Sequence, residues 1–90
     1  MPHVLICHDK PGALAIRLQN RAAHLDYVAA TGCVSLAGPF LDADGQMCGS
    51  LIILALDTRA EAEAWAAGDP YALAGLFAEV RIMAWKKVIG

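Results

Sequence analysis

The run Ser50-Leu-Ile-Ile-Leu-Ala-Leu56 decides the fold of this 90-residue chain. It is apolar on both of its alternating faces, which is typical of a strand covered on both sides, either at the centre of a sheet or at a subunit interface. Thr58 and Glu61 follow with the spacing of a capping box, so we expect a helix to begin there. Trp65 falls on the inner face of this helix, and Gly68 is expected to end it. The run therefore predicts a buried strand followed directly by a helix.

A strand and a longer helix are predicted at the amino-terminal end. Val4 to His8 is a short apolar stretch rich in β-branched residues, and it stops at the turn-forming sequence Asp9-Lys10-Pro11-Gly12. A helix is predicted from Ala13 to about Ala30, with Gly32 as its stop, because apolar residues recur there at spacings of three and four. The stripe that we expect to face the core consists of Leu14, Leu18, Ala22, Leu25 and Val28 or Ala29.

A strand and a loop are predicted between this helix and the central run. The strand covers Cys33 to Ala37 and ends at Gly38-Pro39, because proline removes a backbone donor and the pair breaks an extended run. Residues 40 to 49 are predicted to form a loop around the tight-turn dipeptide Asp44-Gly45. This loop would join two antiparallel strands.

The remaining residues supply the last elements of the fold. Asp69-Pro70 has the form of an N-cap followed by proline at the first helical position, so a short helical turn is predicted over Tyr71 to Ala74. Leu76 to Val88 is predicted to be the last strand, with its alternate residues on opposite faces. The resulting order, β-α-β-β-α-β, predicts an α+β, ferredoxin-like fold, in which a four-stranded antiparallel sheet carries both helices on one face.

Composition and charge limit the possible functions. A hydrophobic fraction of 58% in 90 residues fits one domain and leaves no room for a second core. The net charge is -2 and the basic residues are scattered, so we expect neither nucleic acid nor a membrane surface as a partner. No secretory signal and no apolar run of the ~20 residues that span a bilayer is present. Three cysteines without C-x-x-C spacing favour a reducing cytoplasm.

The second face of the predicted sheet has no helix to cover it. That face would carry apolar side chains from the central strands and from Met83 or Trp85. A large exposed apolar patch is costly for a monomer in water, so we expect a partner to cover it. The simplest arrangement is a two-fold homodimer with the sheets face to face, which could assemble further.

Several short segments have an order and spacing that identify a family: Asp9-Lys10-Pro11, Arg17-Leu18, Arg21-x-x-His24-Leu25, Ala37-Gly38-Pro39, Gly49-Ser50, Asp69-Pro70-Tyr71 and Trp85-Lys86-Lys87-Val88. Together they resemble the YciI family of small bacterial proteins. The resemblance extends over nearly the whole chain, taken as one domain of residues 1–90. It implies a ferredoxin-like dimeric α+β barrel whose pocket holds a histidine and an aspartate.

The resemblance also implies a chemistry. A related branch of the family includes an enzyme that eliminates chloride from a chlorinated hydroxyhydroquinone by means of a His-Asp pair. Carried onto this chain, the histidine is His24 and the aspartate is Asp69. The segment between Gly38-Pro39 and Gly49-Ser50 could rim the pocket, and it is shorter here than in related members, so the substrate is not carried over. The residues expected to bind a small-molecule ligand are Arg17, Arg21, Gly38, Pro39 and Ser50.

The physical properties of these residues support the same hypothesis. Imidazole has an ordinary pKa of roughly 6.5, so His24 could take up and return a proton near neutral pH. A carboxylate on its other ring nitrogen would fix the tautomer and stabilise the imidazolium. Arg17, Arg21 and His24 lie at spacings of four and three, so they project from one helix face that could bind an anion or an enolate oxygen.

Each of these residues also has a purely structural interpretation. A lone helical histidine more often serves packing than catalysis, and Asp69 could act only as a helix N-cap, a role worth ~1 kcal/mol. The two arginines could form a solvated helix face, paired with Asp26 or the loop acids. Ser50 could be an ordinary residue at the start of a strand.

No metal and no cofactor is predicted. Cys7 and His8 are neighbours in a predicted strand, so they point to opposite faces and cannot share an ion. The chain has neither a glycine-rich phosphate loop nor a G-x-S-x-G motif. Two function classes remain open: a cofactor-independent lyase, isomerase or dehalogenase that uses His24 and Asp69, and a non-catalytic dimeric module that binds a small ligand or a protein.

Overall fold

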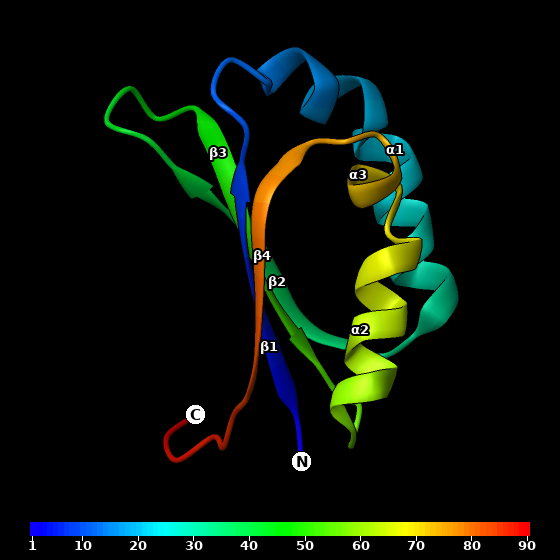
Figure 1. Ribbon diagram of the computed structural model, residues 1–90. Coiled ribbons are helices and arrows are strands. Elements are labelled where there is room, and N and C mark those ends of the chain that lie inside the picture. The colour runs from blue at the N-terminus through cyan, green and yellow to red at the C-terminus, as the bar shows by residue number, and fades with distance from the viewer.

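A four-stranded antiparallel sheet with three helices on one face forms the fold, as the computed structural model of residues 1–90 describes (Figure 1). The strands lie in the order β2-β3-β1-β4. This arrangement confirms the predicted ferredoxin-like β-α-β-β-α-β fold. In chain order, the elements are β1 (His3–Asp9), α1 (Leu14–Thr31), β2 (Val34–Leu41), β3 (Met47–Leu54), α2 (Arg59–Gly68), α3 (Pro70–Leu73) and β4 (Phe77–Ala84).

The main core lies between the two central strands and α2. Thr58 and Glu61 form the predicted capping box, with both reciprocal hydrogen bonds present, and α2 ends at Gly68 as expected. This start directs the inner face of α2 onto the sheet, where Trp65 is 5% exposed. The buried residues of this cluster are Leu5, Cys7, Ile52, Leu54, Ala62 and Trp65.

The strand β2 extends farther than the sequence indicated. It does not stop at Ala37 but continues through Gly38 and Pro39 to Leu41, and Pro39 pairs with Ser50 of β3. Proline is tolerated here because β2 lies at the edge of the sheet, where every second backbone N–H has no strand to bond with. Half of the predicted loop, residues 40, 41 and 47–49, therefore belongs to the two strands of a β-hairpin, which turns at residues 42–46.

The ends of two other strands also differ from the prediction. β3 begins at Met47 and ends at Leu54, not at Leu56. β4 ends at Ala84, not at Val88, because its partner β1 begins at His3 and pairs with Ala84 there. The predicted helical turn after Asp69 is present as α3.

The helix α1 presents only part of the predicted apolar stripe to the core, where Val28 packs against the main cluster. Leu18 and Leu25 are 55% and 47% exposed, whereas the two buried residues of the helix are Arg17 and His24. The long helix is thus turned so that polar side chains point inward, where other polar groups of the chain bind them. Its carboxyl end agrees with the prediction, because Gly32 adopts the left-handed conformation that ends the helix.

The face of the sheet opposite the helices is open. Successive residues of a strand point to opposite faces, so Val4 of β1 lies on this face while its neighbour Leu5 enters the core. Val4 pairs with Met83 of β4 and with Ile53 of β3, and Ile53 pairs in turn with Leu36. Figure 1 shows no helix on this side. None of the helices is long and apolar enough to span a membrane.

Candidate functional site

A cavity of about 180 Å³ lies between α1 and the strands β2 and β3, on the helix-covered side of the sheet. It forms where the inner, polar face of α1 is separated from the edge of the sheet. The side chains around it come from four elements: Arg17, Arg21, His24, Leu25, Val28, Ala37, Gly38, Pro39, Met47, Ser50, Ile52 and Tyr71.

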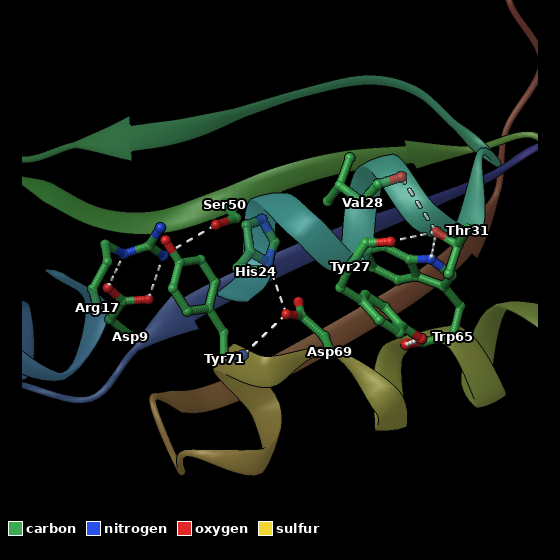
Figure 2. A network of polar contacts seen from close by, with 10 residues as sticks. All are labelled: Asp9, Arg17, His24, Tyr27, Val28, Thr31, Ser50, Trp65, Asp69 and Tyr71. Carbon is green, nitrogen blue, oxygen red and sulfur yellow. Dashed lines mark hydrogen bonds and ion pairs between the residues drawn. The ribbon is translucent and has the colours of Figure 1, made fainter. Parts of the chain in front are cut away.

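His24 and Asp69 are joined by a buried hydrogen bond, although 45 residues separate them in the chain (Figure 2). The Nδ1 atom of His24 lies 2.7 Å from Oδ1 of Asp69, and the two side chains are 9% and 2% exposed. Asp69 is held in turn by the start of α3, because the same oxygen accepts the backbone N–H of Tyr71 at 3.0 Å. Asp69 therefore serves as a helix cap and as a partner of His24 at once.

The opposite ring nitrogen of His24 is free to act in the cavity. An ionised carboxylate only accepts hydrogen bonds, so the contact with Asp69 places the ring proton on Nδ1. Nε2 then carries the lone pair and makes no hydrogen bond within the protein. Every fully buried side-chain nitrogen of the protein has a hydrogen-bond partner. Because Nε2 has none, it is not fully buried, and it is reached from the cavity that His24 lines. This is the tautomer that a general base requires.

Tyr71 fixes the plane of the His24 ring. The two rings are stacked, with centroids 4.1 Å apart and planes 13° from parallel. The guanidinium carbon of Arg17 lies 4.7 Å from the centre of the same tyrosine ring. Burial raises the pKa of Tyr71 above its usual value, against the opposing charges of Arg17 and Arg21. Tyr71 thus remains a neutral phenol between His24 and Arg17.

Arg17 belongs to a second polar cluster beside the first. It donates two hydrogen bonds to Asp9, from Nε at 2.7 Å and from Nη2 at 2.8 Å, and a further one from Nη2 to Ser50 Oγ at 3.0 Å. Figure 2 shows Arg17 and Asp9 on the far side of the Tyr71 ring from Asp69. The alternative interpretation of Arg17, a solvated helix face paired with Asp26 or the loop acids, is wrong, because Arg17 is buried and Asp9 at the end of β1 takes that place.

The structure brings the other sequence-predicted residues to the same cavity. Arg21 lies one helical turn after Arg17, makes no ion pair and is exposed at the rim. Gly38 and Pro39 line the opposite wall, within the edge strand and not at its end. Of the seven predicted site residues, only Asp69 does not line the cavity, because it lies behind His24.

Ser50 reaches the cavity because Gly49 allows two strands to approach closely. A Cβ atom at position 49 would collide with the backbone carbonyl oxygen of Cys7 and would lie 3.0 Å from Cδ2 of Phe40. Glycine is therefore required where β3 passes β1, and the next residue, Ser50, points toward the helices at 4% exposure.

Two residues of the site were missed by the sequence reasoning. The sequence places Asp9 in a turn and Tyr71 in a short helix, and both in segments of the family resemblance, but it gives neither a role in the site. A signal existed for each: Asp9 ends a strand eight residues before an inward-facing arginine, and Tyr71 follows the capping aspartate by two positions. Neither signal gives a contact without the fold. No group of three or more histidine, cysteine or acidic side chains is arranged to hold a metal ion.

Known proteins resemble this chain over nearly its whole length. A sequence profile of the YCII-related domain matches residues 1–86. The protein named YciI of Escherichia coli O6:H1 is 33% identical over an alignment of 97 positions, which covers 98% of this chain and 99% of that protein. An uncharacterised protein of Haemophilus influenzae has the same identity and coverage.

A solved structure shares the fold in detail. It is the 5-chloro-2-hydroxyhydroquinone dehydrochlorinase TftG of Burkholderia phenoliruptrix AC1100, in complex with 2,5-dihydroxybenzoquinone. The TM-score is 0.89 at 34% identity, and the alignment covers 96% of this chain and 94% of TftG. The likeness thus extends over the strands and helices that surround the cavity.

Proposed function

Because this chain belongs to the YCII-related domain family, we propose that it is a small acid–base enzyme in which His24 exchanges a proton with a small oxygenated or aromatic substrate. Asp69 orients the imidazole, and no cofactor takes part. The buried hydrogen bond of 2.7 Å between Nδ1 of His24 and Asp69 carries this proposal. It supports a lone pair on Nε2 at the wall of the cavity, where a bound substrate would meet it.

The size of the cavity limits the substrate. An engineered protein cavity of ~150 Å³ takes up benzene, so a volume of about 180 Å³ suits one six-membered ring with few substituents. TftG, a structural neighbour at 34% identity, is a dehydrochlorinase of a substituted ring and was solved with a dihydroxybenzoquinone. We take ring compounds with several oxygen substituents as the substrate class.

The reaction that fits this class best is an elimination. Nε2 of His24 takes a proton from the substrate, and the electron pair left behind forms a new π bond. The leaving group departs with its own bonding pair as an anion, chloride in the case of a chlorinated ring. Asp69 stabilises the imidazolium until Nε2 returns the proton to solvent, so the net change is the loss of one acid molecule from the substrate.

We propose further that the chain acts as a homodimer, with the open sheet faces in contact, as a dimeric α+β barrel. Leu36 and Met83 on this face are 65% and 39% exposed, and they flank the paired residues Val4 and Ile53. Burial of this apolar surface by a second copy would lower the free energy of the folded state.

Release of chloride from 5-chloro-2-hydroxyhydroquinone, used as a probe of this substrate class, tests the function under anaerobic conditions. We expect release by the wild-type chain and a loss of about 10²- to 10⁴-fold in kcat for His24→Gln, which removes the base but keeps a polar side chain of similar size. His8→Gln is the matched control, because His8 is exposed on the open face of the sheet.

Three results would argue against this function. Equal rates in His24→Gln and the wild type would exclude His24 as the base. Equal losses in His24→Gln and His8→Gln would point to general damage. Binding of the ring compound without turnover would favour the alternative function, a ligand-binding module.

A further inference from the structure

Tyr27 lies one helical turn after His24 on α1 and contacts the end of α2. Its Oη donates a hydrogen bond of 2.8 Å to the backbone carbonyl of Trp65, and the two aromatic rings pack with centroids 5.0 Å apart. Residues three positions apart project from the same side of a helix, so His24 and Tyr27 both reach the chain around Asp69. Figure 2 shows the two side chains pointing from α1 toward this stretch.

The hydrogen bond of Tyr27 replaces one that α2 gives up where it ends. In an unbroken helix the N–H of Asp69 would bond to the carbonyl of Trp65, four residues earlier. The chain instead becomes extended at Asp69, with φ -61° and ψ 125°, and this N–H bonds to the carbonyl of Ala66 at 3.4 Å. The turn lets the Asp69 side chain reach His24, and the Tyr27 hydroxyl binds the carbonyl that has lost its helical donor.

The absence of a side chain at position 68 makes room for the phenol. A Cβ atom there would lie 2.6 Å from Oη and 3.3 Å from Cζ of Tyr27. The tyrosine is thus in close contact with Gly68, the residue directly before Asp69. Burial raises the pKa of Tyr27, and the negative charge of Asp69 raises it further, so the phenol keeps its proton and remains a donor.

The Tyr27 hydroxyl has no contact with the cavity. Tyr27 is not among the residues that line it, and Oη is bound to the Trp65 carbonyl. Removal of this hydroxyl would leave every cavity-lining side chain in place. It could therefore act on a reaction in the cavity only through the chain that carries Asp69.

We propose that Tyr27 is a positioning residue of the acid–base pair, whose hydroxyl fixes the turn between α2 and α3 that presents the Asp69 carboxylate to Nδ1 of His24. This inference rests on the proposed function, because the orientation of the His24 ring affects a rate only if the ring exchanges a proton. A displacement of ~1 Å caused by a change away from the reacting atoms can lower a rate about 10²-fold. Loss of one hydrogen bond at this turn is a smaller disturbance of the same kind.

The nitrogen NMR shifts of the His24 ring test the proposal, because they report which ring nitrogen carries the proton. We expect the wild type to carry it on Nδ1. In Tyr27→Phe, which removes only the hydroxyl, the shifts should move toward those of Asp69→Ala, in which the carboxylate is absent. The signals are assigned by their loss in His24→Gln.

Thr31→Val is the matched control for Tyr27→Phe. Thr31 Oγ1 accepts another hydrogen bond between α1 and α2, from Nε1 of Trp65 at 2.9 Å, at a place that does not touch the turn at Asp69. Both variants lose one hydrogen bond of the same helix contact, so we expect a similar fall in Tm for each. Only Tyr27→Phe should change the nitrogen shifts of His24.

The kinetics of chloride release supply a second readout. We expect kcat of Tyr27→Phe to fall about 10-fold while KM changes less than about twofold, because the cavity keeps its side chains. Thr31→Val should match the wild type in both constants. A purely structural role of Tyr27 predicts the same result for the two variants.

Gly68→Ala tests the contact from the side of α2. The added methyl group would meet Oη of Tyr27, so the variant should move the His24 nitrogen shifts when Tyr27 is present. In the Tyr27→Phe background the collision with Oη is gone, so adding Gly68→Ala should have a much smaller effect. Equal effects in the two backgrounds would show that the hydroxyl does not act on this turn.

The remaining outcomes separate the inference from the proposed function. Nitrogen shifts that Tyr27→Phe leaves unchanged would overturn the positioning role, and so would equal changes in Tyr27→Phe and Thr31→Val. Chloride release that depends on His24 but not on the Tyr27 hydroxyl would keep the enzyme and overturn the positioning role. Shifts that respond to Tyr27→Phe in a chain that releases no chloride would keep the action of Tyr27 on the pair and reject the enzyme.

Discussion

At the scale of single residues, the buried face of α1 is built from polar groups that neutralise one another across the fold. Arg17 pairs with Asp9, and His24 pairs with Asp69. The Tyr71 ring lies between the two pairs, stacked on His24. Each member of these two pairs thus has a partner inside the fold, and this removes most of the cost of taking it out of water. Because polar side chains occupy the inner face of the helix, leucines are exposed on its outer face.

The two roles of Asp69 can be separated by two substitutions. Asp69→Asn retains an oxygen that can cap α3 but loses the negative charge beside His24, so we expect a small change in stability and a fall in kcat of about 10²- to 10⁴-fold. Asp69→Ala removes the cap as well, which should cost ~1 kcal/mol more in the free energy of unfolding. Urea unfolding and chloride release, measured on both variants, check this. Equal activity of Asp69→Asn and the wild type would reduce Asp69 to a helix cap.

Cys7 predicts a loss of stability at high pH. Burial raises the pKa of its thiol to about 12, with a further contribution from the charge of Asp69. An unfolded cysteine ionises at roughly pH 8.5, so above that pH the unfolded state binds fewer protons than the folded state. The free energy of unfolding should therefore fall with a slope of up to ~1.4 kcal/mol per pH unit from this group.

Urea unfolding between pH 8 and 10.5 measures this slope. We expect Cys7→Ala to be less stable than the wild type but to lose less stability as the pH rises. Cys48→Ala is the control, because Cys48 is only half-buried, and it should keep the wild-type slope. Parallel curves for Cys7→Ala and the wild type would contradict the account of Cys7.

At the scale of elements, the meeting of β1 and β3 depends on the absence of a side chain at position 49. Gly49→Ala would force its methyl group against the Cys7 carbonyl oxygen and the Phe40 ring. We expect it to lower the free energy of unfolding by ~1–3 kcal/mol, in the range of overpacked cores. Gly38→Ala is the matched control, because a Cβ atom there has no neighbour within 4 Å. Chemical denaturation of both variants checks the difference, and equal stabilities would contradict the close approach.

The periodic elements could be predicted from the sequence, but their orientation could not. The capping box, the stop at Gly68 and the short turn after Asp69 all depend on residues close together in the chain, and all three are confirmed. The rotation of α1 depends on Asp9 and Asp69, which reach it only through the folded sheet. Hydrophobic spacing alone therefore predicted the inner face of this helix only in part.

The candidate site, too, could be predicted only in part, because some of its contacts depend on the folded sheet. The sequence and its family resemblance brought His24 and Asp69 together correctly as neighbours. They did not assign Arg17 to Asp9, because a pattern of spacing within one helix carries no information about the strand opposite. They also ended the strand at Gly38-Pro39, since the tolerance of proline depends on the position of β2 at the sheet edge.

At the scale of the whole molecule, the helices cover one face of the sheet and leave the other to solvent (Figure 1). Val4 and Ile53 on the open face are each only 8% exposed, because neighbouring side chains such as Leu36 and Met83 shield them. The exposed apolar surface of the open face therefore belongs mainly to outer residues such as Leu36 and Met83. A second copy placed on this face would bury them, and it would leave the cavity on the opposite side of the sheet unobstructed.

Leu36 is the residue whose substitution tests the dimer most directly. It is 65% exposed on the edge strand of the open face, so Leu36→Glu should be tolerated in a monomer but should place two carboxylates in an apolar interface of the dimer. Leu73→Glu is the matched control, because Leu73 is 75% exposed on α3, on the helix side of the sheet. We expect light scattering after size exclusion to report dimers for the wild type and Leu73→Glu, and monomers for Leu36→Glu. The wild-type Tm should rise with protein concentration, since association stabilises the folded chain, and that dependence should vanish in Leu36→Glu. A wild-type monomer with a concentration-independent Tm would rule out this face as a dimer interface.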